Sequence, residues 1–473
     1  MHTALMSTMD WAVTEFGGAE LGDQRRTRRL AQVAARLADD PHGTLPQTFS
    51  IWSELKAAYR LLEEPDVTRE AIAAPHIQRV RQACRPPGDY LFVEDTTSLD
   101  FTSHPAARDL GPIDNRRRRG LYTHSTLAMQ IDAWDEHNNP QVTIAGVAAQ
   151  HCWVRPERKR TDGPLESDRW AALIAEIGPP PEPARYTFVA DRESDIFETI
   201  RRCRSQQWDF VIRANQARAM VDQDGSIFDA VAAAPVLGRF HIALRSRPKR
   251  VRRHKKTGKP KRTRKAHGPR TAVLEVRTCT VRVRPPKALG ASAEPSTLHL
   301  VEAREVNAAA GDDPIHWVLL TSWPCGGMRD AIRVVKAYAR RWLIEEYHKA
   351  LKTGTGIEAS QLATADRLLA LLGILAVVAA RLLNRKLLAT TRPDDRTAAE
   401  DLGETALRIL AASFGCPTEG WTNRTVLRSI ARLGGFLARK NDGEPGWITI
   451  WRGWQRLLLM MQGFLLAEGE KCG

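Results

Sequence analysis

The sequence has 473 residues, more than a single hydrophobic core normally serves, so two or three domains are expected. Hydrophobic residues make up 43% of the chain, a share that is typical of globular proteins and excludes a disordered one. Seventy lysines and arginines against 55 aspartates and glutamates leave a net charge of +15, which favours a polyanionic partner, nucleic acid ahead of a membrane surface.

Helices are expected in the first ninety residues. Asp23 is a candidate N-cap for an arginine-rich helix, and the segment 53–64 predicts another helix that ends before Pro65. Acidic residues near the N-terminus stand where a signal peptide would have a basic start, so a cytoplasmic location is expected. Cations in the first turns of a helix oppose the favourable sign of its dipole, which indicates phosphate contacts, although a solvated face explains them equally well. These cations are Arg25, Arg26, Arg28 and Arg29.

From residue 90 the pattern changes to strands that alternate with helices, which predicts an α/β fold. A strand-rich stretch from about Trp208 to Thr321 interrupts this alternation, and after Gly356 the chain reads as almost entirely helical. The longest uncharged apolar run, 368–380, has thirteen residues, too few to span a bilayer, and predicts a buried helix.

Seven cysteines without any CxxC or CxxH pair argue against a zinc site and indicate reduced thiols.

The segment from Arg245 to Arg270 is unusually basic. It contains fourteen lysines and arginines and no acidic residue. Because proline and glycine lie within it, we do not expect the interior of a strand, and we predict a mobile hairpin tip or loop.

Two aspartates are expected at the carboxyl ends of strands, where open α/β sheets gather functional groups. Asp95 ends "LFVED" and Asp191 ends "TFVAD", and Glu345 on a later helix could complete a cluster of three carboxylates. Hard divalent cations such as Mg²⁺ prefer such oxygen ligands, and two of them can clamp a phosphoryl group during transfer. Alternatively, aspartates at strand ends often begin turns. Neighbouring carboxylates that compete for the role are Glu94, Glu193, Asp195 and Glu346.

The segment "YARRWLIEEYHKALKTG", residues 338–354, is predicted to be one helix. At about 100° per residue, four of its polar side chains share one narrow face and its apolar residues line the opposite side. The four are Tyr338, Arg341, Glu345 and Lys352. A solvated face with Arg341 and Glu345 as an ordinary ion pair is the alternative, and Arg340 on the apolar side has no explanation from the sequence.

This segment resembles the Y-x2-R-x3-E-x6-K signature of the IS-four-type bacterial insertion-sequence transposases. Six further segments are similar to that family in the same order, namely "LGDQRRTRRL", "AAYRLLEEPDV", "VEDTTSL", "ADRESDI", "WVLLTS" and "IARLGGF". The resemblance implies an RNase H-like catalytic core with a β-rich insertion, flanked by N-terminal and C-terminal helical domains. The implied domains are 1–70 for DNA binding, 71–370 for catalysis with the insertion at about 205–325, and 371–473 for dimerisation.

The resemblance also implies roles for individual residues. Asp95, Asp191 and Glu345 would be the catalytic ligands of two Mg²⁺ ions, for which Mn²⁺ can substitute. Tyr338, Arg341 and Lys352 would grip DNA phosphates, Trp317 would stack on a base, and Arg213 would contact DNA.

The implied function is cut-and-paste DNA transposition in bacterial cytoplasm, associated with the nucleoid. The partners would be double-stranded DNA, as terminal inverted repeats and as target, and a second copy of the chain on paired ends. Two alternatives stay open: a metal nuclease with the same core, and a transposase-derived DNA-binding protein that has lost its chemistry.

Overall fold

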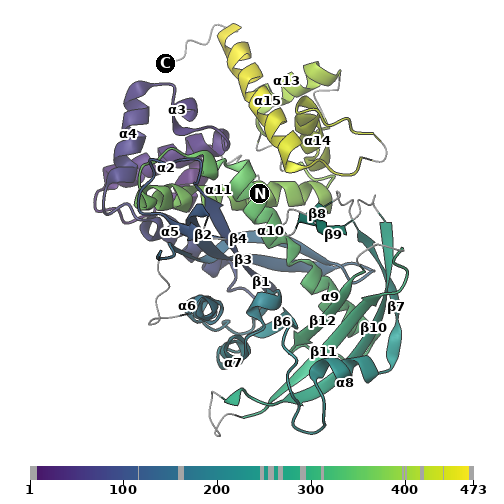
Figure 1. Ribbon diagram of the computed structural model, residues 1–473. Coiled ribbons are helices and arrows are strands. Elements are labelled where there is room, and N and C mark those ends of the chain that lie inside the picture. The colour runs from purple at the N-terminus through teal and green to yellow at the C-terminus, as the bar shows by residue number, and fades with distance from the viewer. Residues whose placement is uncertain are drawn as a thin grey trace.

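We describe the protein from a computed structural model. It describes residues 8–114, 117–157, 165–244, 250–253, 260–264, 270–287, 294–309, 314–396, 399, 402–415, 420–439 and 442–467. Helices at the N-terminus, drawn in purple in Figure 1, pack beside a large central sheet, and the C-terminal helices, in yellow, lie above it.

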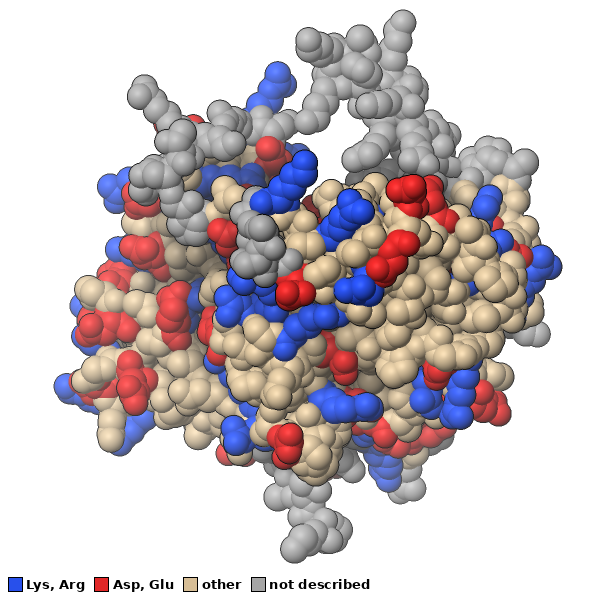
Figure 2. All heavy atoms as spheres, turned by 90° about the horizontal axis from the view of Figure 1, so that it is seen from below, with Lys and Arg blue, Asp and Glu red and all other residues tan. Residues whose placement is uncertain are grey.

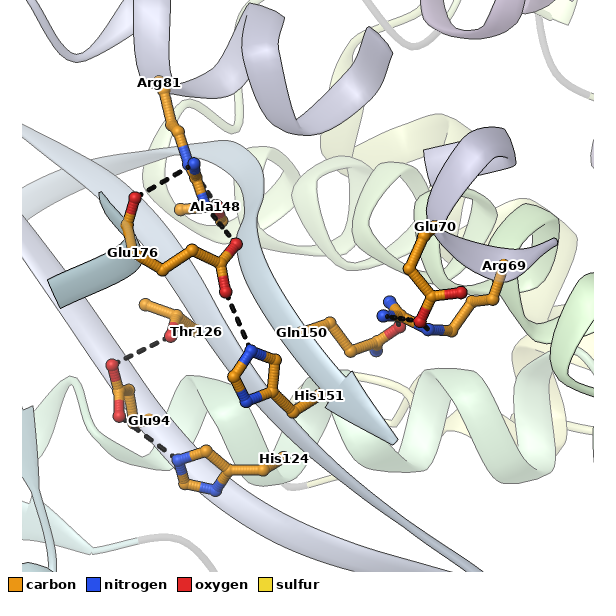
Figure 3. Close-up of polar contacts among 10 residues, drawn as sticks. All are labelled: Arg69, Glu70, Arg81, Glu94, His124, Thr126, Ala148, Gln150, His151 and Glu176. Atoms are coloured by element: carbon orange, nitrogen blue, oxygen red, sulfur yellow. Dashed lines mark hydrogen bonds and ion pairs between the residues drawn. The ribbon is translucent and has the colours of Figure 1, made fainter. Parts of the chain in front are cut away.

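The N-terminal region is helical, as expected. Asp23 caps the second helix, since its Oδ1 accepts a hydrogen bond from the backbone N–H of Arg25 at 2.7 Å. Arg81 on the last of these helices donates to the Ala148 carbonyl and pairs with Glu176, which ties the region to the sheet (Figure 3). The helices are α1 (Thr8–Phe16), α2 (Gln24–Asp39), α3 (Leu45–Thr48), α4 (Trp52–Glu63) and α5 (Arg69–Ala83).

A ten-stranded sheet runs through the described residues in the order β2-β3-β1-β5-β6-β12-β11-β10-β7, with β4 paired to β3. Strands β1, β5 and β6 are mutually parallel, and the other pairings are antiparallel. The strands are β1 (Asp89–Asp100), β2 (Gly111–Ile113), β3 (Arg118–Trp134), β4 (Pro140–Trp153), β5 (Arg185–Ala190), β6 (Asp209–Arg213), β7 (Val236–Leu244), β10 (Arg270–Val283), β11 (Ser296–Glu305) and β12 (His316–Thr321).

The β-rich insertion extends the core sheet instead of forming a separate one. β12 pairs with β6 on one side and with β11 on the other, so hydrogen bonding continues from the core into the insertion. Within the basic segment, β8 (Arg250–Arg253) and β9 (Pro260–Arg264) form an antiparallel pair. Of the two forms expected for this segment, a hairpin tip or a loop, the antiparallel pair agrees with the hairpin. The expectation that proline would keep these stretches out of strands is wrong, since the proline is tolerated as the first residue of its strand. The rest of the segment up to residue 269 lies outside the described residues.

Each face of the sheet carries its own helices and its own core. One face packs against α6 (Arg169–Ile177), α7 (Phe197–Ser205) and α8 (Ile227–Ala233). The other packs against α9 (Met328–Ala339), α10 (Trp342–Lys349) and α11 (Ala365–Thr391). Both faces are therefore apolar, as expected for a central sheet covered on both sides.

The run 368–380 forms the buried part of α11, which confirms the helix expected there. The domain boundary expected at residue 370 falls inside this helix, whose buried residues belong to the same core as the sheet. A separate small core joins α13 (Glu404–Phe414), α14 (Asn423–Leu433) and α15 (Trp447–Ala467). Among the described helices, none is both long and apolar enough to cross a bilayer.

Candidate catalytic site

Strand β1 places Asp95 on the face that α10 covers. Side chains alternate along a strand, so Leu91, Val93 and Asp95 point one way, and the first two belong to the core beneath α10 and α11. Phe92 and Glu94 point the other way, toward α6 and α7. β1 continues to Asp100, so Asp95 lies in the middle of the strand and not at its end, as the sequence had suggested.

Asp191 follows the last residue of β5, as expected. Val93 pairs with Val189 across the parallel strands, and two residues further along both strands the same alternation brings Asp95 and Asp191 to one face. Asp191 also caps the short helix η2 (Arg192–Ser194), because its Oδ1 accepts from the Glu193 N–H at 2.9 Å.

Glu345 reaches these aspartates from α10, but the expected single helix is broken. α9 ends at Ala339 and α10 begins at Trp342. At the break Arg340 donates from Nη2 to the Pro140 carbonyl at 2.5 Å, which explains a side chain that the helical wheel left unexplained. The segment then closes with a π-helical turn, η4 (Ala350–Gly354).

Arg341 connects the carboxylates. Its Nη2 lies 2.6 Å from Glu345 Oε1, and its Nη1 lies 3.5 Å from Asp95 Oδ2. The guanidinium is mostly buried, with 13% of the side chain exposed. A cation therefore already lies between two of the three predicted ligands.

Burial, followed by the nearby carboxylates of Asp191 and Glu345, raises the pKa of Asp95 to about 7, against the opposing charge of Arg341. Crowded carboxylates of this kind are characteristic of sites that bind a hard cation. Within the described residues, no three acidic, histidine or cysteine side chains are arranged closely enough to hold a metal ion as they stand. The donor chemistry thus fits a divalent cation, whereas the present geometry pairs the carboxylates with Arg341.

A second group of predicted residues lies together beside the carboxylates. The guanidinium of Arg213 lies beside the Tyr338 hydroxyl, and burial raises the pKa of that hydroxyl against the nearby charges of Arg341 and Arg213. The Trp317 ring meets the Tyr338 ring edge-on, with centroids 5.1 Å apart. Trp317 is half-buried, so part of its surface is accessible while the remainder packs on the core.

Lys352 lies apart from this group. The π-helical turn displaces it from the helical register, and its Nζ is 3.9 Å from Glu358 Oε1. Glu358 also accepts the Asp100 backbone N–H at 2.9 Å. The structure therefore brings Tyr338, Arg341 and Glu345 to the carboxylates but places Lys352 near the far end of β1.

The competing carboxylates have other partners. Glu94 is fully buried and bonded to His124 and to Thr126, the latter at 2.8 Å (Figure 3). Asp195 pairs with Arg218, and Glu346 binds two lysines. The pKa of Glu193 is raised by burial and then by the charge of Asp191, so this carboxylate senses the cluster.

Sequence reasoning missed His348, which is buried behind the site. Burial lowers its pKa to about 3, and the positive charges of Lys352, His124 and Arg341 contribute. On a helical wheel His348 falls roughly 20° from Arg341. Its position on the same face as the signature residues could therefore have identified it as a neighbour of the site.

The four arginines of α2 differ in their surroundings. Arg26 is held by Glu64 and Asp66, the latter at 2.9 Å, and by the Leu21 carbonyl. Arg25 pairs with its own N-cap, yet 87% of its side chain is exposed. Arg28 is exposed and Arg29 is half-buried. Of these four arginines, Arg25 and Arg28 are thus the accessible ones.

The excess positive charge does not gather on the face seen from below in Figure 2. Over the described residues of that face, lysines and arginines are interspersed with aspartates and glutamates.

Comparison with known protein families gives three matches along the chain. Residues 8–67 match the family described as Transposase DNA-binding. Residues 165–381 match Transposase DDE domain, and residues 405–470 match Transposase Tn5 dimerisation domain. The middle match includes Asp191 and Glu345 and begins after Asp95. A DDE domain has an RNase H-like core, which confirms the fold expected from the sequence.

Proposed function

This chain is a DDE transposase with a transposase DNA-binding domain and a Tn5 dimerisation domain, and we propose that it is a cut-and-paste enzyme acting on paired transposon ends. Enzymes of this class cleave DNA and transfer strands with divalent metal ions. In the proposed reaction, water cuts one strand at each terminal inverted repeat. The freed 3′-hydroxyl attacks the opposite strand to form a hairpin, a second hydrolysis opens it, and the 3′ ends join target DNA.

We assign the metal ligands to Asp95, Asp191 and Glu345, with two Mg²⁺ ions as the cofactor and Mn²⁺ as a substitute. The observation that carries this assignment is the register of β1 and β5, which brings Asp95 and Asp191 to one face of the sheet, together with Arg341, which contacts both Asp95 and Glu345. When bound, the cations activate water and neutralise charge on the attacking and leaving oxygens. The side chains themselves bind and position, and none acts as a nucleophile.

The cationic neighbours are assigned to DNA. Arg341, Arg213 and Lys352 supply positive charge for phosphates, and the Tyr338 hydroxyl can donate to one. A hairpin bends the backbone so sharply that a base near the turn loses its stacking. Trp317 offers that base a ring worth about 1–3 kcal/mol of stacking, comparable to the cost of unstacking.

The remaining assignments concern partners and location. Arg25 and Arg28, the accessible pair among the four arginines at the start of α2, are proposed to contact the terminal repeats, with Arg26 and Arg29 supporting them. Two copies are proposed to assemble on paired ends. Because DNA is both substrate and target, we place the enzyme in the cytoplasm at the nucleoid.

The test is replacement of each carboxylate by alanine. Asp95→Ala, Asp191→Ala and Glu345→Ala should each bind transposon ends yet lose cleavage by about three orders of magnitude, because several kcal/mol of charge stabilisation disappears. Asp89→Ala, at the half-buried start of the same strand β1, is the matched control and should cleave normally, because Asp89 pairs with the exposed Arg185 at the other end of the strand from the cluster. Near-normal cleavage by any of the three variants removes that residue from the site.

Two other functions remain distinguishable. A metal nuclease with the same core would cut the ends without joining them, so a strand-joining assay with a target plasmid separates it from a transposase. A DNA-binding protein without chemistry would bind the ends and leave them intact. The three carboxylates on one face argue against this last possibility.

A further inference from the structure

The residue after Glu345 forms a separate charged centre. Glu346 is buried, with 8% of its surface exposed. One carboxylate oxygen accepts from Lys349 Nζ at 2.7 Å. The other accepts from Lys386 Nζ at 2.8 Å and from the indole N–H of Trp447 at 2.9 Å. Adjacent residues on a helix point about 100° apart, so Glu346 faces away from the carboxylate cluster and its partners exclude it as a metal ligand.

Three different helices supply these partners. Lys349 belongs to α10 itself and Lys386 to α11, whereas Trp447 is the first residue of α15. α15 lies in the matched dimerisation region. Trp447 is buried in the core that contains α10 and α11, although Leu457 further along α15 belongs to the separate C-terminal core. α15 therefore contributes residues to two hydrophobic cores, that of the central sheet and that of the C-terminal helices.

A second tryptophan strengthens the connection. Trp451 stacks on Trp447 with centroids 5.5 Å apart and an interplanar angle of 9°. It also lies against Gly354, where an added Cβ would come within 2.5 Å of Trp451 Cζ2. Gly354 ends the π-helical turn that carries Lys352. The start of α15 thus contacts the catalytic segment at two points, beside Glu345 and beside Lys352.

We propose that Glu346 is a positioning residue through which α15 of the dimerisation domain holds Glu345 in its catalytic position. The inference rests on the proposed catalytic role of Glu345. Two lysines hold the charge of Glu346 in place, and the Trp447 N–H makes its position depend on α15. The link from α15 to the catalytic segment thus consists of one hydrogen bond and one stacked pair of rings.

The first test uses two tryptophans of the same helix in the full-length protein. Trp447→Phe keeps an aromatic ring in the stack but removes the N–H that reaches Glu346. Trp454→Phe is the matched control, because its indole N–H donates to the Asp39 carbonyl at 2.8 Å and does not touch α10. First-strand nicking is measured in single turnover with saturating transposon ends, and the affinity for the ends is measured separately.

We expect Trp447→Phe to nick about 10- to 100-fold more slowly, in the range that small misplacements of catalytic groups produce. Its affinity for ends should stay within twofold, and Trp454→Phe should nick within twofold of wild type. Equal rates for the two variants, whether both normal or both slow, would overturn the inference, since α15 would then have no specific link to Glu345.

The second test is a double-mutant cycle. Glu346→Gln removes the charge that the two lysines hold and should slow nicking to a similar extent. The combination with Trp447→Phe should be slower by less than the product of the two single effects, because both changes act through the position of Glu346. Fully additive losses would contradict the inference. Glu345→Ala in the same assay separates the two proposals. If it is inactive while Trp447→Phe and Glu346→Gln nick normally, only the positioning role fails, and if it nicks normally, the proposed catalytic role fails.

Discussion

Asp95 resists ionisation when no divalent cation is present. Burial is the main cause, and together with the charges of Asp191 and Glu345 it raises the pKa from an ordinary carboxyl value to about 7. A native pKa above the unfolded one means that the folded protein binds more protons, so stability falls as pH rises between the two values. The cost is complete above about pH 7, where the carboxylate is charged in both states.

Asp95→Asn should therefore stabilise the metal-free protein at neutral pH. With chelator present, we expect the variant to gain roughly 2–4 kcal/mol over wild type at pH 7.5, an upper range for a shift of about three pKa units. The gain should shrink toward zero near pH 4. Thermal or urea unfolding across pH 4–8 measures it.

Asp89→Asn is the control for this effect. Asp89 begins the same strand and pairs with Arg185, whose side chain is 69% exposed. Loss of such a surface pair should change stability by less than about 1 kcal/mol at any pH. If Asp95→Asn is no more stable than Asp89→Asn at pH 7.5, ionisation of Asp95 does not destabilise the folded protein.

The choice between Asp95 and Glu94 as the metal ligand shows what the sequence can predict about a single residue. Both alternating faces of β1 are apolar, through Leu91 and Val93 on one side and Phe92 on the other. Periodicity therefore cannot tell which face α10 covers. Family resemblance selected Asp95, and the packing of the helices supplies the physical reason.

At the scale of elements, propensity predicted one helix for residues 338–354. The sequence contains no proline or internal glycine there to signal a break. The break coincides with a contact between Arg340 and Pro140, which are 200 positions apart. Such tertiary contacts are not visible in a local pattern. The π-helical turn that displaces Lys352 likewise coincides with the docking of Trp451 on Gly354.

Gly354→Ala tests that docking. The added methyl group would overlap the Trp451 ring, and such overpacking typically costs about 1–3 kcal/mol. We expect a lower melting temperature for Gly354→Ala, and Trp451→Leu in the same chain should recover part of the loss. Gly446→Ala is the control, since an added Cβ there meets no atom within 4 Å. A melting temperature for Gly354→Ala equal to that of the control would show that the contact is loose.

At the scale of the whole molecule, composition and element patterns gave the α/β class and the helical ends but not how the parts join. The pattern could not show that the insertion continues the core sheet through the pairing of β6 with β12. It also could not show that α11, although apolar, belongs to the catalytic body beyond residue 370. Both features depend on contacts between segments that are far apart in the sequence. A single apolar run is compatible with several such packing arrangements, so its pattern does not select one.

The outer surface of α15 carries an apolar stripe that is suited to self-association. Ile448, Leu459 and Leu466 are 57%, 67% and 67% exposed. At about 100° per residue, all three fall within roughly 20° of one another on the helix. The helix lies in the region that matches a dimerisation domain, so we expect this stripe to meet a second copy of the chain.

Leu459→Asp should therefore weaken pairing without affecting binding to a single end. A charge buried at an apolar interface without a partner costs several kcal/mol, enough to reduce paired-end complexes at least about a hundredfold. Gel shifts with single and paired ends measure the two steps separately. Leu437→Asp is the control, because Leu437 is equally exposed at 67% but lies outside α15. Normal paired-end complexes with Leu459→Asp, or equal loss with Leu437→Asp, would place the dimer contact elsewhere on the protein.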